Sequence, residues 1–119
     1  MNRRTLGSWG EDRACEALKK SGLKILERNY TSPLGEIDII AREKKTLVFV
    51  EVKTRSSDAY GEPSEAVDRA KRRHILRTAQ VYMARHDWTD RPVRFDIVEV
   101  FPDCVRHIPD AFDGSPLLR

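Results

Sequence analysis

The sequence predicts a mixed α/β domain in which a hairpin-built β-sheet is flanked by α-helices, in the order αβββαβ(β). Three observations predict this class. An amphipathic helical pattern lies near the N-terminus, β-type segments with short turns follow it, and a second long helical pattern precedes one or two further strands. We expect a single domain over residues 1–119, because this length suits one hydrophobic core and no linker composition divides the chain.

The first helix is predicted from its end signals. Ser8 and Glu11 have the spacing of a capping box, and Gly22 is typical of a helix stop. One helix face carries residues at i, i+3, i+4 and i+7, namely Glu11, Ala14, Cys15 and Leu18. Glu11 therefore borders the buried stripe, and it is either the capping-box acid or a functional acid.

Three strands are predicted next. Residues 23–30 form the first strand, and it ends in the turn-forming residues 31–35. Glu36–Ala41 and Thr46–Arg55 are the second and third strands, which we expect to be antiparallel neighbours. A four-residue polar loop over residues 42–45 separates them.

The second half of the chain predicts a helix and one or two strands. Residues 56–63 indicate an exposed loop, after which Ser64 caps a long helix that runs to about His86. Its apolar stripe consists of Ile75, Leu76, Ala79, Tyr82 and Met83. Val93–Phe101 is a fourth strand and Cys104–Ile108 a short fifth, followed by a loose tail from about residue 109 to residue 119.

Composition excludes some classes of protein. The chain is 39% apolar and 34% charged, which is unlike a disordered or a membrane protein. The net charge of +3 is compatible with an anionic polymer as partner. No apolar leader or membrane span is predicted, so we expect a cytoplasmic protein with no membrane partner. Cys15 and Cys104 are far apart without CxxC neighbours, which favours reduced thiols.

Charged residues interrupt the two most apolar strands. Side chains alternate across a strand, so Glu51 and Lys53 share one face, and Glu36 shares a face with Asp38. If the four-residue loop centres the hairpin, Glu36 faces Glu51 and Asp38 lies beside them. A loop one residue longer would separate the two sets, because a one-residue slip turns every side chain to the other face.

Clustered carboxylates in a half-buried sheet need compensating positive charge. Lys53 supplies one charge, and a divalent cation would supply two. Asp38 and Glu51 offer hard oxygen ligands, which suit Mg²⁺ or Mn²⁺. Such an ion lowers the pKa of a bound water and neutralises charge on a phosphodiester, while Lys53 orients that water or stabilises the same charge. The reaction class that this constellation indicates is phosphodiester hydrolysis.

Plainer interpretations of the same residues remain. Glu51 and Lys53 could form an ion pair on an exposed strand, and Asp38 could be a charge that protects an edge strand from aggregation. Glu36 is either a further ligand or a charge at the start of a strand.

The runs GEIDIIA, VFVEVKTR and RFDIV, after a helix that bears a glutamate, resemble the PD-(D/E)xK nuclease superfamily with its restriction-endonuclease-like fold. More closely, they resemble the YraN-type family of small bacterial endonuclease-like proteins, relatives of archaeal Holliday junction resolvases. The resemblance covers residues 7–100. It implies that Asp38 and Glu51 are metal ligands, Lys53 is the catalytic lysine and Glu11 is an additional acid. Ile37 stands where the motif has its proline. The kinship also implies a homodimer.

Arginines recur every four residues on the second predicted helix, at positions 69, 73 and 77, and Arg55 adds charge nearby in sequence. Arg55, Arg69, Arg73 and Arg77 could bind phosphates without sequence preference, or the three helical arginines could form an ordinary solvated face.

Three functions follow from these features. The first is a nuclease that uses Mg²⁺ or Mn²⁺ to hydrolyse DNA, on substrates that include branched or flapped structures. The second is a nucleic-acid-binding module with this fold and weak or no cleavage. The third is a structural protein in which Lys53 neutralises the acidic cluster.

Overall fold

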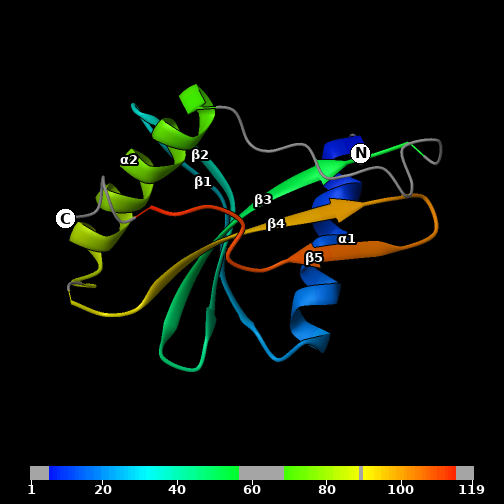
Figure 1. Cartoon of the computed structure of the whole chain (residues 1–119), viewed down its shortest axis with the longest axis horizontal. Coiled ribbons are helices and arrows are strands. Elements are labelled where there is room, and N and C mark those ends of the chain that lie inside the picture. The colour runs from blue at the N-terminus through cyan, green and yellow to red at the C-terminus, as the bar shows by residue number, and fades with distance from the viewer. Residues whose placement is uncertain (1–5, 57–68, 89, 115–119) are drawn as a thin grey trace, which may run out of the picture.

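The computed structural model describes residues 6–56, 69–88 and 90–114, which form two helices and five strands (Figure 1). In chain order the elements are α1 (Leu6–Lys20), β1 (Lys24–Ser32), β2 (Gly35–Glu43), β3 (Thr46–Thr54), α2 (Arg69–Arg85), β4 (Val93–Val100) and β5 (Val105–Ile108). This order confirms the predicted mixed α/β class. No helix among the described residues is long and apolar enough to cross a membrane.

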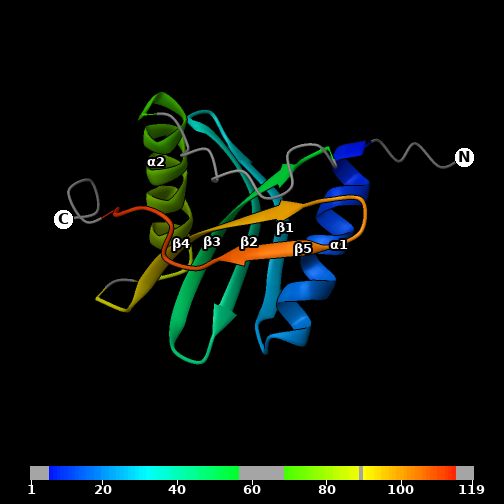
Figure 2. The same cartoon turned by 45° about the vertical axis from the view of Figure 1, so that its right-hand side comes forward.

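The strands form one sheet in the order β1-β2-β3-β4-β5. β3 and β4 are parallel, and every other neighbouring pair is antiparallel. The segment between β3 and β4 includes α2, which lies on one side of the sheet while α1 lies on the other (Figure 2). β2 is an internal strand, so the interpretation of Asp38 as an edge-strand charge is wrong.

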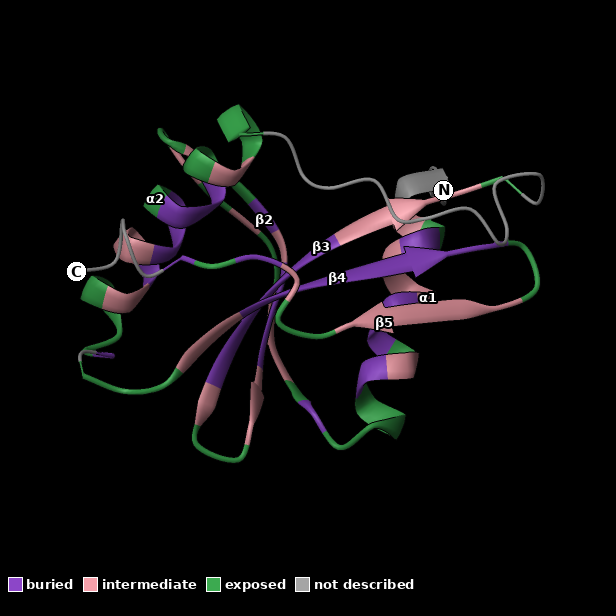
Figure 3. Ribbon diagram, in the orientation of Figure 1, coloured by how far each residue is buried: buried purple, intermediate pink, exposed green. Residues whose placement is uncertain are grey.

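Each face of the sheet has its own hydrophobic core. The core under α2 is aromatic and includes Phe49, Tyr82 and Phe95. The core under α1 is built from smaller side chains, among them Leu18 and Val50. β3 serves both cores because its residues alternate between the two faces, and it runs through the buried centre of the molecule (Figure 3).

The start of α1 differs from the prediction. The helix begins at Leu6, so Ser8 lies inside it and is not its N-cap. Gly10 packs the helix backbone against β3, where an added Cβ would lie 2.5 Å from Thr54 Oγ1. Packing on the sheet therefore holds this turn, and the capping-box role predicted for Glu11 is wrong. The end is as predicted: Gly22 has a φ of 95° and donates to the Lys19 carbonyl at 3.0 Å.

The β2–β3 hairpin is tighter than predicted. Glu43 pairs directly with Thr46, so the turn has two residues, and Lys44 adopts the positive φ of 53° that such a turn requires. The four-residue loop was wrong because Glu43 extends the strand, where it forms a 2.8 Å ion pair with Arg94. The register moves by two residues, which keeps the paired residues 39–43 on the faces that alternation predicts but removes Glu36 from the position opposite Glu51.

The expectation of a loose tail is wrong for residues 109–114. The Ala111 amide donates to the Phe95 carbonyl at 2.7 Å, and the Phe112 ring stacks on Phe95 at 5.2 Å. Aromatic burial therefore fixes this segment on the α2 core. Residues 115–119, the Ser64 cap and residues 57–63 of the predicted loop lie outside the described residues, whereas the apolar stripe of α2 is confirmed.

Candidate active site

Asp38 lies where β2 changes face. Ile37 packs in the core under α2, whereas Ile39 packs in the core under α1, although residues two apart in a regular strand share one face. On the neighbouring strand Asn29 has a left-handed φ of 54°, and it interrupts the pairing between Arg28↔Ile39 and Tyr30↔Ile37. The irregularity leaves Asp38 between the two faces of the sheet.

Asp38 and Glu51 are brought together where the β2–β3 pairing ends. The last paired residues are Ile39 and Val50. Beyond them the Val52 amide donates to Asp38 Oδ2 at 2.8 Å, so the carboxylate takes the place of a backbone acceptor. The sequence prediction that these two acids meet on adjacent strands agrees with this geometry.

Burial and the neighbouring Glu51 perturb the carboxyl group of Asp38. Its pKa is raised from 3.8 to about 7 by burial, which is the largest cause, by the negative charge of Glu51 and by a hydrogen bond between the two groups. The Val52 amide acts in the opposite direction, because it stabilises the ionised form. Glu51 is only 5% exposed, so the interpretation of an ion pair on an exposed strand is wrong for this residue. At neutral pH the Asp38 carboxyl group is therefore protonated part of the time.

Glu11 approaches the pair from α1. Burial raises the pKa of its carboxyl group, and the negative charge of Asp38 raises it further. Glu11 Oε1 lies 3.6 Å from the Arg28 guanidinium and is buried without a hydrogen-bond partner among the described residues. Arg28 also forms a 2.8 Å ion pair with Asp12. Glu11 lies in the second turn of α1, which excludes the capping interpretation, and its functional role stays a prediction.

Two lysines serve this region from different elements. Lys53 is half-buried on β3, two residues after Glu51 and therefore on the same face, and its cross-strand partner on β4 is Glu99. Lys71 comes from the first turn of the described part of α2, and its ammonium contacts Glu51 Oε2 directly.

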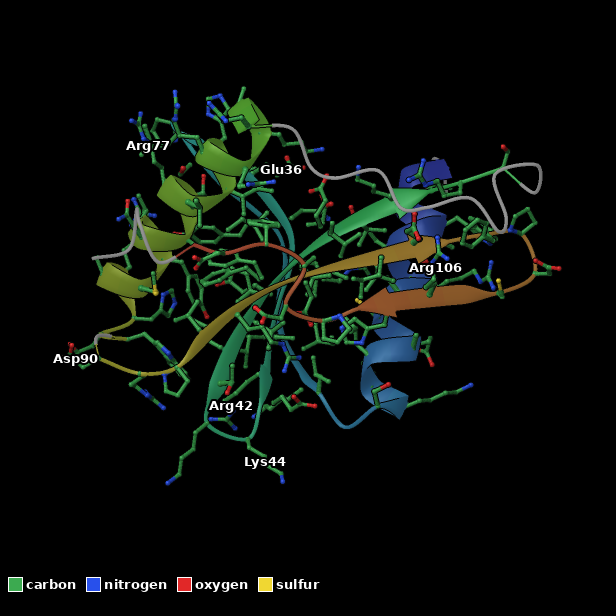
Figure 4. The ribbon with its side chains drawn as sticks, viewed as in Figure 1. Glu36, Arg42, Lys44, Arg77, Asp90 and Arg106 are labelled. Carbon is green, nitrogen blue, oxygen red and sulfur yellow. The ribbon has the colours of Figure 1, made fainter. Side chains whose placement is uncertain are left out.

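A cleft of about 600 Å³ opens beside the acid pair. One wall is the tip of the β1–β2 hairpin and the other is the start of α2, whose contributing residues are Lys71, His74 and Ile75. Glu36 lines the cleft as an exposed residue and lies near the same end of the molecule as α2 (Figure 4). The acids thus stand at the inner wall of an open groove and not in a closed cavity.

The four arginines predicted to bind nucleic acid fall into two places. Arg69, Arg73 and Arg77 are exposed on α2, and Figure 4 shows Arg77 on the outer side of that helix. Arg55 instead lies at the end of β3, where it forms a 3.0 Å ion pair with the buried Glu99.

Sequence reasoning missed two residues of the site, Lys71 and His74. Neither residue was among the candidates drawn from the sequence. Both lie on α2, and no local pattern states where a helix will dock on a sheet. His74 lines the cleft and its Nδ1 lies 2.8 Å from the Leu34 carbonyl oxygen.

Comparisons with known proteins agree with this architecture. Residues 10–100 match the model of the Uncharacterised protein family UPF0102. UPF0102 proteins from Persephonella marina and Syntrophotalea carbinolica are 48% and 49% identical over 107 and 115 residues. These alignments cover 90% and 93% of this chain, and 92% and 94% of the relatives.

A solved structure shares the fold. It is the 1.6 Å structure of Archaeoglobus fulgidus Hjc, a Holliday junction resolvase from an archaeal hyperthermophile, with a TM-score of 0.53 and 20% sequence identity. The match covers 86% of this chain and 75% of that chain. The family match and the relatives, which align over nearly their whole length, show that the chain belongs to the uncharacterised protein family UPF0102.

Proposed function

We propose that this protein is a metal-dependent nuclease that hydrolyses phosphodiester bonds in DNA. The observation that carries the proposal is the acid pair: Asp38 and Glu51 meet on adjacent internal strands and line an open cleft, and the pKa of Asp38 is raised to about 7. Perturbed carboxyl groups in a cleft are characteristic of functional sites. The sequence resemblance to the PD-(D/E)xK nucleases and the fold shared with Hjc support the same reading.

The residues present fit a divalent metal ion. A buried carboxyl group such as Asp38, whose proton affinity a neighbouring carboxylate raises, gains by exchanging its proton for a cation. Their hard oxygen atoms match the preferences of Mg²⁺ and Mn²⁺, which complete their shells with water and substrate phosphate. The described residues contain no group of three or more His, Cys, Asp or Glu side chains arranged to hold a metal. Asp38 and Glu51 are therefore the proposed protein ligands, and Glu11 lies outside the ligand set.

Each residue has a distinct task in this proposal. A bound Mg²⁺ or Mn²⁺ would supply Lewis-acid stabilisation of the phosphate and a water of lowered pKa. Asp38 and Glu51 would hold the ion, and Asp38 would have to be ionised to do so. Lys53 is the catalytic lysine, because its ammonium, two residues from Glu51, is suited to orient the attacking water or to balance the charge that develops on phosphate oxygens. Glu11 adds negative charge from α1 beside Asp38.

Hydrolysis has a simple atom balance. A water oxygen bonds to phosphorus, one ester P–O bond breaks, the attacking water loses a proton and the leaving oxygen gains one. The exposed arginines at 69, 73 and 77, together with Arg55, are proposed to bind the phosphates of the substrate, which positions the backbone without reading its sequence.

The test is cleavage of labelled duplex, flapped and branched DNA in Mg²⁺ or Mn²⁺, with Glu51→Gln and Asp38→Asn as matched variants. Both substitutions keep the side-chain shape and remove one ligand charge. Metal-dependent cleavage by the wild type that is lost in both variants supports the proposal. Cleavage that survives in both variants would exclude this acid pair as the site.

The second candidate is a nucleic-acid-binding module with weak or no cleavage. The contact between Lys71 and Glu51 favours it, because a protein cation already neutralises part of the acidic pair. Salt-dependent DNA binding without cleavage in either metal would support this alternative. The homodimer and the cytoplasmic location remain predictions, which sedimentation and cell fractionation test directly.

A further inference from the structure

The tip of the β1–β2 hairpin carries an unusual side chain. Ser32 pairs with Gly35, so Pro33 and Leu34 are the two residues of the turn. Leu34 is 43% exposed, and in the described part of the chain the only other exposed large hydrophobic side chain is Trp9, on α1. Single exposed leucines are common on protein surfaces, so exposure alone carries no function.

The tip is distinguished by how firmly its backbone is held. His74 Nδ1 lies 2.8 Å from the Leu34 carbonyl oxygen, and the Leu34 amide donates to Ser32 Oγ at 3.1 Å. Ser32 Oγ in turn lies 3.4 Å from Thr78 Oγ1 on α2. Gly35 has a φ of 154° and packs so closely on α2 that an added Cβ would lie 3.0 Å from Thr78 Oγ1. The peptide groups on both sides of Leu34 are thus fixed to α2, while its side chain faces solvent.

The tip also borders the cleft of the acid pair. Pro33 and Leu34 line the same 600 Å³ cleft as Asp38 and Glu51. A substrate whose phosphate reached the acids would therefore bring its neighbouring sugar or base against this apolar tip. The opposite wall of the cleft is the start of α2, which contributes Lys71, His74 and Ile75. The cleft thus combines the acid pair and the polar groups of α2 with an apolar corner that suits a base.

We propose that Leu34 is a specificity-determining residue that packs against the face of an unstacked base beside the phosphate held in the cleft. This inference rests on the proposed function of the site. Apolar side chains that contact base steps must first unstack them, which is costly in continuous duplex and nearly free where a base is already unpaired. Leu34 therefore makes the protein prefer DNA with an unpaired or unstacked base next to the reacting phosphate.

The rigidity of the tip strengthens this preference. A flexible loop would lose conformational entropy on contact, whereas the Leu34 backbone is ordered in advance by His74 and Ser32. Leu34→Ser removes the apolar contact with the base. We therefore expect it to lower the preference for DNA with an unstacked base roughly tenfold.

The experiment compares two labelled 30-mer duplexes that differ only by one bulged adenine, cut by the full chain in Mn²⁺. Leu34→Ser removes the apolar contact, Leu34→Met restores an apolar side chain, and Trp9→Ala is the control for an exposed hydrophobic residue on the other side of the sheet. We expect the wild type, Leu34→Met and Trp9→Ala to prefer the bulged duplex, and Leu34→Ser to lose that preference, so that it cuts the two duplexes at equal rates.

Other outcomes separate this inference from the proposed function. If Leu34→Ser lowers the cleavage rates of both duplexes by the same factor, or changes neither rate, Leu34 does not determine specificity. The proposed nuclease activity would not be affected by that result. If the wild type cuts nothing, the proposed function fails, and the fluorescence of 2-aminopurine at the bulge decides the inference. A fluorescence change on binding that is present in the wild type and absent in Leu34→Ser supports the contact, and the same change in both overturns it.

Discussion

Asp38→Asn should stabilise the metal-free protein at high pH and not at low pH. The asparagine keeps an oxygen that can accept the 2.8 Å hydrogen bond from the Val52 amide, but it removes the charge that opposes Glu51. The folded protein holds the Asp38 proton more tightly than the unfolded chain does, because its pKa is raised from 3.8 to about 7. Stability should therefore fall as pH rises from about 4 to about 7, and should stay low above that range.

The magnitude follows from the same shift. Each tenfold change in proton affinity corresponds to about 1.4 kcal/mol, so a pKa raised from 3.8 to about 7 corresponds to on the order of 4 kcal/mol at most. Part of this cost belongs to the Asp38–Glu51 pair and not to Asp38 alone. We therefore expect the free energy of unfolding of Asp38→Asn, relative to wild type, to increase by about 2 kcal/mol between pH 4 and pH 8.

Urea denaturation at pH 4 and pH 8, in the presence of a chelator, measures this difference. Asp103→Asn, at an exposed position between β4 and β5, is the control for removing an aspartate. A stability difference between Asp38→Asn and wild type that is the same at pH 4 and pH 8 would refute the raised pKa of Asp38.

Three further predictions concern the charges around the site. Lys71→Met should bind Mn²⁺ severalfold more tightly than wild type at pH 8.5 in titration calorimetry, because the Lys71 ammonium contacts Glu51 and competes with the metal for it. An unchanged affinity would mean that this contact does not compete with metal binding. Replacing Arg69, Arg73 and Arg77 together by alanine should weaken DNA binding. The slope of log affinity against log salt concentration should become less steep by up to about 3, at about 0.9 per lost phosphate contact. An unchanged slope would show that α2 is not part of the DNA interface. Glu99→Ala should destabilise the protein by about 3 kcal/mol in urea at pH 7, because it leaves Arg55 and Arg106 without their buried carboxylate, whereas a loss under 1 kcal/mol would show that the arginines find other partners.

The alternation of side chains on β3 could be predicted from sequence because it depends only on the strand period. It placed Glu51 and Lys53 on one face. In the structure, Leu47 and Phe49 of the same alternation pack in the core beneath α2. The hairpin register could not be predicted, since it depends on whether Glu43 continues the strand, and that is decided by its ion pair with Arg94 far along the chain. The alternation of apolar and polar residues in the sequence also gives no sign that β2 changes face at Asp38.

The ends of elements and the docking of α2 also lay beyond local patterns. The capping box at Ser8 was outweighed by the packing of Gly10 on Thr54, which is a tertiary contact. Lys71 and His74 belong to the cleft only because α2 crosses the sheet at this point. Sequence reasoning therefore identified the acids on the strands and missed the groups that the helix brings to them.

The crossing of β2 at Asp38 also links two cores that otherwise pack independently. The Asp38 carboxylate interacts electrostatically with Glu11 on α1, on one face of the sheet. It also interacts with Glu51, which contacts Lys71 on α2, on the other face. A cavity made on either side, by Leu18→Ala under α1 or Leu76→Ala under α2, would therefore disturb the same few atoms. Substitutions in either core would therefore change the geometry of the acid pair, so the function of the site limits which core substitutions the protein tolerates.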